Sequence, residues 1–148
     1  MTEIDETDVE IVKKLEKNAR GSFREIAEEL NVSEGTVYNR VKKMQEEGII
    51  KGFSARTDSM KLGKRLVAII GLRVNGGHLV EVEEELAEEE EIRCAYDVTG
   101  EYDAMVIGRF ETRAELNEFV KTTLSNKYVE RTTTHIVLNV VKEDFRTF

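Results

Sequence analysis

The most constraining feature of this sequence is a pair of short, capped helical segments that a very short turn separates. Ser22 and Glu25 have the spacing of a capping box, in which each side chain accepts a hydrogen bond from an amide at the start of a helix. Asn31 tolerates the left-handed conformation that ends a helix, and Ser33 is the N-cap of the next one. An earlier apolar-periodic segment follows its own N-cap, Asp5. Two helices joined in this way, after a first helix, predict a helix-turn-helix.

The helix that begins at Ser33 and runs to about Glu47 has two distinct faces. At about 100° per residue, its apolar side chains Val37, Val41 and Met44 share one face. The rest of its surface carries hydrogen-bonding side chains suited to base edges and phosphates, so it is the candidate DNA-reading element. The candidate DNA-contacting residues are Ser33, Thr36, Tyr38, Asn39, Arg40 and Lys43.

Arg40 is the first choice for a base or phosphate contact, because a guanidinium can form two hydrogen bonds to guanine. Thr36 and Asn39 follow, and Lys43 is expected at a phosphate. Two such helices related by a two-fold axis enter successive major grooves, so a palindromic double-stranded operator is expected. Packed helical bundles that bind nothing share the same caps, and the polar face is what favours DNA here.

Charge is placed unevenly along the chain. It has 148 residues with 30 Asp and Glu against 22 Lys and Arg, a formal net charge of −8, which gives no hint of nucleic acid. Within residues 35–56, however, five basic side chains stand against only two acidic ones, Glu46 and Glu47. A small DNA-reading surface requires a local basic patch of this kind, although a solvated helix face gives the same count.

Composition argues against several other classes. The single cysteine, Cys94, excludes an internal disulfide and a cysteine-based zinc site, and only two histidines are present, so no metal or cofactor is expected. The longest uncharged apolar run, 66–72, is far shorter than the roughly 20 residues of a membrane-spanning helix. The acidic N-terminus does not resemble a signal peptide. A cytoplasmic protein without a membrane partner is therefore expected.

The remainder of the chain predicts a second, α+β domain. We expect a helix-turn-helix domain with its exit segment at 1–56, a polar linker at 57–65 and the second domain at 66–148. Its expected elements are strand 66–74, a helix through Leu79, Val82 and Leu86, strands 92–98 and 104–110, a helix capped by Thr112, and a long final strand 129–141. This βαββαβ order is the ferredoxin-like arrangement, with both helices on one face of an antiparallel sheet.

The other face of that sheet is expected to be apolar. That face could offer Val67 and Ile69 of the first strand with Met105 and Ile107 of the third, or the residues that alternate with them. A bare apolar sheet face usually marks an oligomer interface, so we expect the second domain to form a homodimer.

Three stretches resemble one known family, the Lrp/AsnC or feast/famine transcriptional regulators. The stretch 31–41 is similar to that family's recognition helix, and 47–52 to the exit from it. The turn 99–103, Thr-Gly-Glu-Tyr-Asp, is similar to the family's Gly-Asp/Glu-Tyr-Asp turn. The resemblance covers essentially the whole chain. It implies dimers, which often assemble further into octamers, and an amino-acid effector bound between the second domains.

The resemblance also directs attention to an effector site beside the turn 99–103, at a contact between dimers. Backbone amides near a glycine can receive an α-carboxylate, and carboxylate side chains can pair with an α-ammonium group. The candidate effector-binding residues are Gly100, Glu101, Tyr102 and Asp103, with Thr132, Thr133 and Thr134 of the last strand. The alternative is a plain hairpin turn whose residues serve geometry and solubility.

Two other functions are compatible with a two-domain chain of this kind. One is a ligand-binding or interaction module whose DNA-binding head has decayed, which the polar residues of the third helix oppose. The other is an enzyme, because sirohaem decarboxylases resemble the same two-domain fold. Those enzymes differ in Pro- and Trp-containing signatures and catalytic histidines, and this chain contains neither Pro nor Trp. The prediction is therefore a DNA-binding regulator and not an enzyme.

Overall fold

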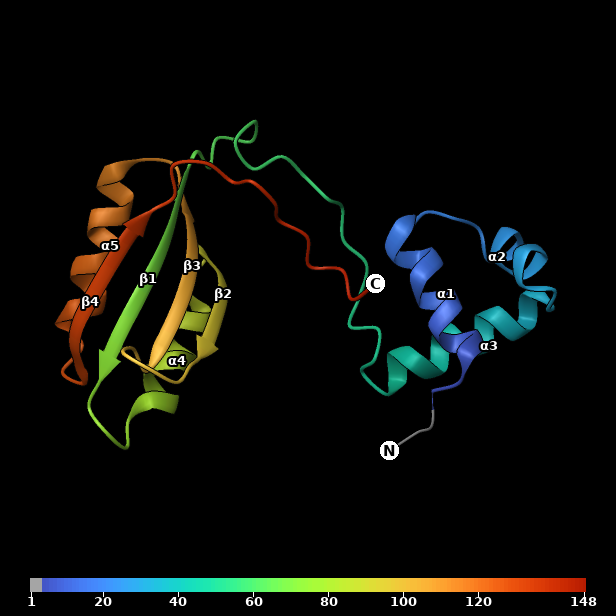
Figure 1. Cartoon of the computed structure of the whole chain (residues 1–148), viewed down its shortest axis with the longest axis horizontal. Helices are drawn as coiled ribbons and strands as arrows, with labels where there is room; N and C mark the ends of the chain where they lie inside the picture. Colours follow the sequence, from blue (N-terminus) through green and yellow to red (C-terminus); the bar gives the residue numbers. More distant parts are fainter. Residues whose placement is uncertain (1–3) are drawn as a thin grey trace. The chain divides into compact units, whose positions relative to one another are not determined.

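A computed structural model describes residues 4–148, and they form two compact units (Figure 1). The first contains the chain up to Arg56 together with Glu143–Phe148, and the second contains Thr57–Lys142. The prediction had kept 143–148 with the second domain. They join the first because the amides of Thr147 and Phe148 donate hydrogen bonds of 2.8 and 3.0 Å to the Glu16 carboxylate.

The first unit consists of helices α1 (Glu6–Lys17), α2 (Phe23–Leu30) and α3 (Glu34–Glu46). The predicted caps are confirmed: the N-caps are Asp5, Ser22 and Ser33, and each side chain accepts a hydrogen bond from the helix it begins. Asn31 ends α2 in the left-handed conformation, with φ of 57°. The expected helix-turn-helix is therefore present, with Asn31–Ser33 as its turn.

The core of the first unit takes one apolar stripe from each helix. Its buried residues are Ile11, Leu15, Ile26, Ala27, Val37, Val41 and Met44. Ile11 of α1 and Val37 of α3 are completely inaccessible to solvent. The predicted apolar face of α3 thus packs against α1 and α2, and this packing decides which side of α3 faces outward. Residues 47–65 then leave the helix as turns and extended chain.

The second unit contains β1 (Leu66–Val74), α4 (Leu79–Glu88), β2 (Ile92–Asp97), β3 (Ala104–Phe110), α5 (Arg113–Ser125) and β4 (Val129–Ile136). The strand order is β2-β3-β1-β4, with every neighbouring pair antiparallel. Both helices cover one face of the sheet (Figure 1). This is the predicted ferredoxin-like arrangement.

The long final strand expected at 129–141 is wrong at its end, because β4 stops at Ile136. Its partner β1 begins at Leu66, and the last pair in the ladder joins Ala68 and Ile136. One more amide, that of Val137, reaches the Val67 carbonyl at 2.9 Å. The β-branched residues beyond have no strand to pair with, and a strand persists only where a neighbour receives its hydrogen bonds.

The two faces of β1 differ as the alternation predicts. Ala68, Ile70 and Leu72 face α4 and α5 and are fully buried. The register pairs Ile69 with Ile107, so both lie on the other face, which we call the outer sheet face. Both are only half-buried in the single chain. Among residues 4–148, no helix has the length and apolar character to cross a membrane.

Candidate nucleic-acid interface and effector turn

The start of α3 is built by two hydroxyl groups. The Ser33 Oγ accepts a hydrogen bond of 3.1 Å from the Thr36 amide and lies 2.8 Å from the Thr36 Oγ1. Ser33 is exposed and Thr36 is half-buried. Each hydroxyl therefore has a partner within the cap. The Ser33–Thr36 cap as a whole borders the exposed surface of α3, where DNA could contact it.

Asn39, Lys42 and Lys43 form the exposed polar row of α3. All three are exposed on the side of the helix away from Val37 and Met44. Within the described residues, the side chains of Asn39 and Lys43 make no hydrogen bond or ion pair. Lys42 lies 3.8 Å from the carboxylate of Glu46, one turn later. The exposed polar row is thus available to bind another molecule.

Lys42 is the residue that the sequence-based set omitted. Its position three residues after Asn39 places it on the same side of a helix. That spacing was visible in the sequence. The residues predicted from the sequence instead include Thr36 and Arg40, which lie on the other edge of the helix and closer to the core.

Tyr38 lies on the opposite edge of the exposed surface, and 54% of it is accessible. Its ring meets that of Phe23 of α2 edge to face, with centroids 6.4 Å apart. The contact holds the ring at the junction of α2 and α3, while the hydroxyl is on an exposed side chain. This arrangement suits a contact to the DNA backbone.

The structure gives Arg40 two acidic partners within the first unit. One guanidinium nitrogen, Nη1, donates hydrogen bonds of 2.7 Å to Asp5 and 2.8 Å to Asp8, at the start of α1. Only 31% of the Arg40 side chain is accessible, and only 13% of that of Asp8. Arg40 is therefore engaged inside the first unit, where it links α3 to α1, and its contact with DNA stays a prediction.

The pKa values of this cluster follow its hydrogen bonds. The Asp8 amide, and then the Arg40 guanidinium, hold the pKa of Asp5 below its ordinary value of 3.8. The carboxylates of Asp8 and Asp5 raise the pKa of Arg40. Asp5 and Asp8 also cap α1 reciprocally, so one charged cluster stabilises both the helix start and the helix pair.

The candidate effector turn of the second unit is tied to the end of β1. Asp103 accepts a hydrogen bond of 2.9 Å from the Val74 amide through its carboxylate, and its own amide donates to the Leu72 carbonyl at 2.9 Å. The Arg73 Nε donates to the Glu101 carbonyl at 2.7 Å. The Asp103 carboxylate therefore has a structural task, whereas the Glu101 side chain is exposed.

Tyr102 lies against a glycine that the sequence analysis did not single out. A Cβ atom on Gly71 would stand 2.7 Å from the Tyr102 ring, closer than any real contact. Gly71 is thus required for the ring to lie flat on β1. A glycine in the middle of a β-branched strand is the signal that was available for this close approach.

The three threonines of β4 do not act as one row. Thr132 pairs with Leu72 and Thr134 with Ile70, so both lie on the helix-covered face. Thr133 pairs with Gly71 and shares the outer sheet face with Tyr102. The expected set is therefore corrected: strand alternation separates Thr132 and Thr134 from the turn. Gly100 adopts a φ of 124°, a conformation that favours glycine.

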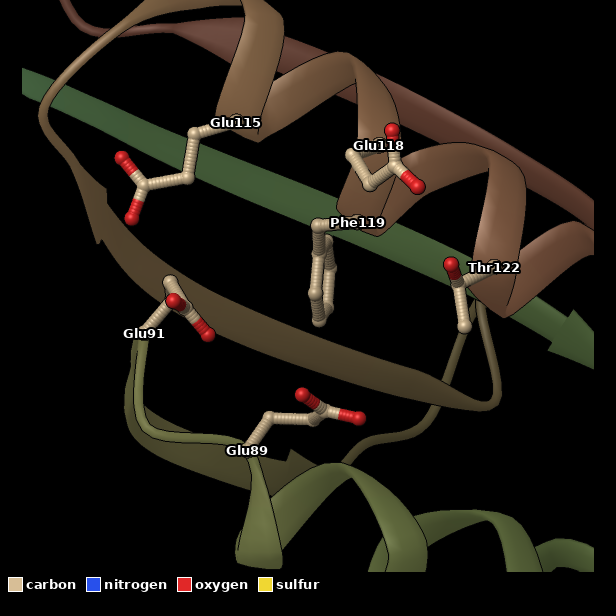
Figure 2. A pocket seen from close by; sticks show the side chains of 6 residues that line it. All are labelled: Glu89, Glu91, Glu115, Glu118, Phe119 and Thr122. Carbon is tan, nitrogen blue, oxygen red and sulfur yellow. The ribbon is translucent and has the colours of Figure 1, made fainter.

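A separate cleft of about 270 Å³ lies on the helix-covered side of the second unit (Figure 2). Its lining residues are Glu89, Glu91, Glu115, Glu118, Phe119 and Thr122. The carboxylates around the Phe119 ring make it unsuited to DNA or to an α-carboxylate. In the part of the chain that the structure describes, no group of three or more His, Cys, Asp or Glu side chains is arranged to hold a metal ion.

Comparison with known proteins identifies both units. The family model of the Lrp/AsnC ligand-binding domain matches residues 67–147, and that of a winged helix-turn-helix DNA-binding domain matches residues 4–51. An uncharacterised HTH-type transcriptional regulator of Pyrococcus abyssi is 49% identical, with 97% of each chain covered. The HTH-type transcriptional regulator Ptr1 of Methanocaldococcus jannaschii is 44% identical over 79% of each chain.

Solved structures show the same architecture. The AsnC protein of E. coli has a TM-score of 0.87 and 26% identity, with 97% of each chain covered. A transcriptional regulator of Neisseria meningitidis, determined as a complex with L-Met, also has a TM-score of 0.87, with 23% identity over 97% of this chain and 96% of its own.

Replacing Arg40 by Ala is expected to lower the stability of the first unit by about 1 kcal/mol, because the Asp8 carboxylate loses a charged partner in a mostly buried place. Lys43→Ala, on the exposed row of the same helix, is the matched control and should change stability by less than about 0.5 kcal/mol. Urea unfolding followed by circular dichroism measures both.

The same difference should depend on pH. The pKa of Asp5 in the folded protein lies below 3.8, its ordinary value. The stability that ionised Asp5 contributes is therefore complete above pH 3.8 and is lost as the pH falls through the folded-state pKa. The parent and the Arg40→Ala variant should therefore converge in acid. Equal stability of the two proteins at neutral pH would contradict the role given to this cluster.

Proposed function

The chain belongs to the Lrp/AsnC family of transcriptional regulators, and on this premise we propose that a dimer of it reads a palindromic operator through α3 and responds to an amino acid or a similar small metabolite. Its relatives are named as transcriptional regulators, which sets the enzymatic alternative aside. The decayed-module alternative conflicts with the intact core of the first unit and with the polar outer side of α3.

The observation that carries the proposal is the exposed polar row of α3. An asparagine amide can form two hydrogen bonds to adenine in the major groove, which gives Asn39 the role of base reader. Lys42 and Lys43 are point charges suited to phosphates, and Tyr38 with the Ser33–Thr36 cap lies at the rim, where the DNA backbone passes. Arg40 contributes by holding α3 in place.

We expect Lys43→Ala and Lys42→Ala each to weaken binding to every duplex and to reduce the slope of log K against log salt by about 1, because each removes one phosphate contact. Asn39→Ala should relax the preference at one base pair by about 1–3 kcal/mol. The probe is a duplex that the parent protein selects from a random pool, measured by fluorescence anisotropy at several salt concentrations.

Lys121→Ala on α5 is the control for these variants, since it removes an exposed lysine from the second unit. It should leave both the affinity and the salt slope unchanged. If Asn39→Ala and Lys43→Ala bind the selected duplex as the parent does, α3 is not the reading element.

Dimer formation is proposed through the outer sheet face. Ile69, Met105 and Ile107 are half-buried there, and Tyr96 of β2 is 48% exposed beside them. An apolar face of this kind, framed by polar residues, is typical of a protein–protein interface. A stable dimer buries about 1,600 Å² in total, about half of it on each copy.

Sedimentation of the full chain at micromolar concentration should therefore give a dimer or a larger even assembly. Ile107→Asp should lower the average mass toward that of a monomer, since it places a charge in the apolar contact. Val80→Asp on α4 is the control, because Val80 is 66% exposed on the helix layer. A parent protein that sediments as a monomer would remove this face from the interface.

Effector binding is proposed beside the turn 99–103, where two dimers meet. The exposed Glu101 carboxylate suits an α-ammonium group, the backbone around Gly100 is open to a carboxylate, and Tyr102 with Thr133 adds an apolar wall and a hydroxyl. The bound L-Met of the Neisseria regulator, a protein of the same fold, supports an amino acid as the ligand class.

Calorimetry with the twenty amino acids tests this site. A binding amino acid should also shift the assembly state, because a ligand at an interface favours the form that contains it. Glu101→Ala should lower the affinity for that amino acid by about tenfold or more, while DNA binding persists. Asp103→Ala is less informative, since the Val74 amide would lose its partner.

Glu90→Ala, in the exposed turn before β2, is the control for Glu101→Ala and should leave the ligand affinity unchanged. The absence of heat and of any change in assembly for all twenty amino acids would reject both the site and the ligand class.

A further inference from the structure

Gly35 is a residue of α3 for which the protein itself supplies no reason. It lies in the first turn of the helix and is exposed. In the interior of a helix glycine is about 0.5–1 kcal/mol less favourable than alanine, and at the second position of α3 it still gives the helix nothing that alanine would not give. Such a local conflict usually marks a functional position or a close contact.

The space around Gly35 is open. Beyond its chain neighbours and the backbone of its own helix, the described residues place one atom within 4 Å of a Cβ built there: the Ser33 Oγ at 3.8 Å, an ordinary contact distance. The φ angle of Gly35 is not positive, so a side chain would not strain the backbone. The fold therefore accepts alanine here without adjustment.

Two other glycines show what an internal reason looks like. Gly71 lacks a side chain because the Tyr102 ring occupies that place, at 2.7 Å. Gly48, after the end of α3, has a φ of 71°, which side chains resist. Among the described residues Gly35 meets neither condition, which points to a contact outside the chain.

The position of Gly35 shows what that outside surface is. It stands four residues before Asn39 and seven before Lys42, so the three lie in one row along the exposed side of α3. It is also in the N-terminal part of a recognition helix, the part that contacts base edges when such a helix enters the major groove. A missing Cβ at this point lets the helix backbone come closer to whatever α3 faces.

We propose that Gly35 sets the depth of α3 in the major groove, with a base edge or the adjoining sugar-phosphate chain in van der Waals contact where its side chain would stand. The inference rests on the proposed reading of DNA by α3. It makes Gly35 a residue that determines fit and not a hydrogen-bonding contact. A side chain at position 35 should therefore raise the stability of the helix and lower the affinity of the protein for DNA.

The test is a size series, Gly35→Ala and Gly35→Leu, in the full chain. Both variants should be at least as stable as the parent in urea, since alanine and leucine favour helices. Affinity for the duplex that the parent selects from a random pool should fall by about tenfold or more for Ala and further for Leu. Affinity for a scrambled duplex of the same length should fall less, because non-specific binding depends mainly on phosphate charge.

Gly76→Ala is the matched control, because Gly76 is also exposed, has no positive φ and has nothing within 4 Å of a built Cβ. It lies in the second unit and should leave DNA affinity unchanged. Parent-like affinity of Gly35→Ala would overturn the inference, and so would a loss of stability, which would reveal an internal reason for the glycine. A parent that selects no duplex would instead remove the proposed function on which the inference rests.

Discussion

Burial of the apolar row Val37, Val41 and Met44 is the constraint on which the DNA-facing surface depends. Once this row packs on α1 and α2, helical geometry leaves no choice about which residues point outward. Asn39, Lys42 and Lys43 are exposed because they occupy the other side. The hydrogen bonds of Arg40 to Asp5 and Asp8 then link α3 to the start of α1, so a charged cluster within the unit helps to fix the surface that we propose for DNA.

The second unit obeys the same rule with a period of two. Burial of Ala68, Ile70 and Leu72 under the helices leaves Ile69 and Gly71 on the outer sheet face. The turn 99–103 then closes over that face, because Tyr102 lies on Gly71 and Asp103 holds the Val74 amide. Hydrogen bonds and close packing thus tie the turn to β1, and a small-ligand site requires residues that are held in place in this way.

Acidic and basic residues are concentrated in different parts of the chain. Residues 79–91 contain eight glutamates and no basic residue, whereas the basic residues of 35–56 include Lys42 and Lys43 on the exposed row of α3. A polyanion is repelled by the first surface and attracted by the second. The excess of negative charge therefore restricts where DNA can approach, and the net charge of the whole chain conceals this.

The sequence by itself determined the helices, their caps and the order of the strands. These depend on neighbours within a few residues: Ser22 with Glu25, Asn31 at the end of a helix, and the alternation along β1. It also determined the family, since 31–41 and 99–103 are local stretches.

What the tertiary structure decided are the relations between distant residues. Arg40 looks free on a helical wheel, and only the approach of α1 brings Asp5 and Asp8, more than thirty residues away, to its guanidinium. Gly71 gains its meaning only when Tyr102 folds over it. The final strand ends at Ile136, opposite Ala68 near the start of β1, and the register to β1 assigns Thr133 to one face and Thr132 to the other. Local propensity cannot contain this information, because each of these outcomes depends on a partner that the chain brings near only by folding.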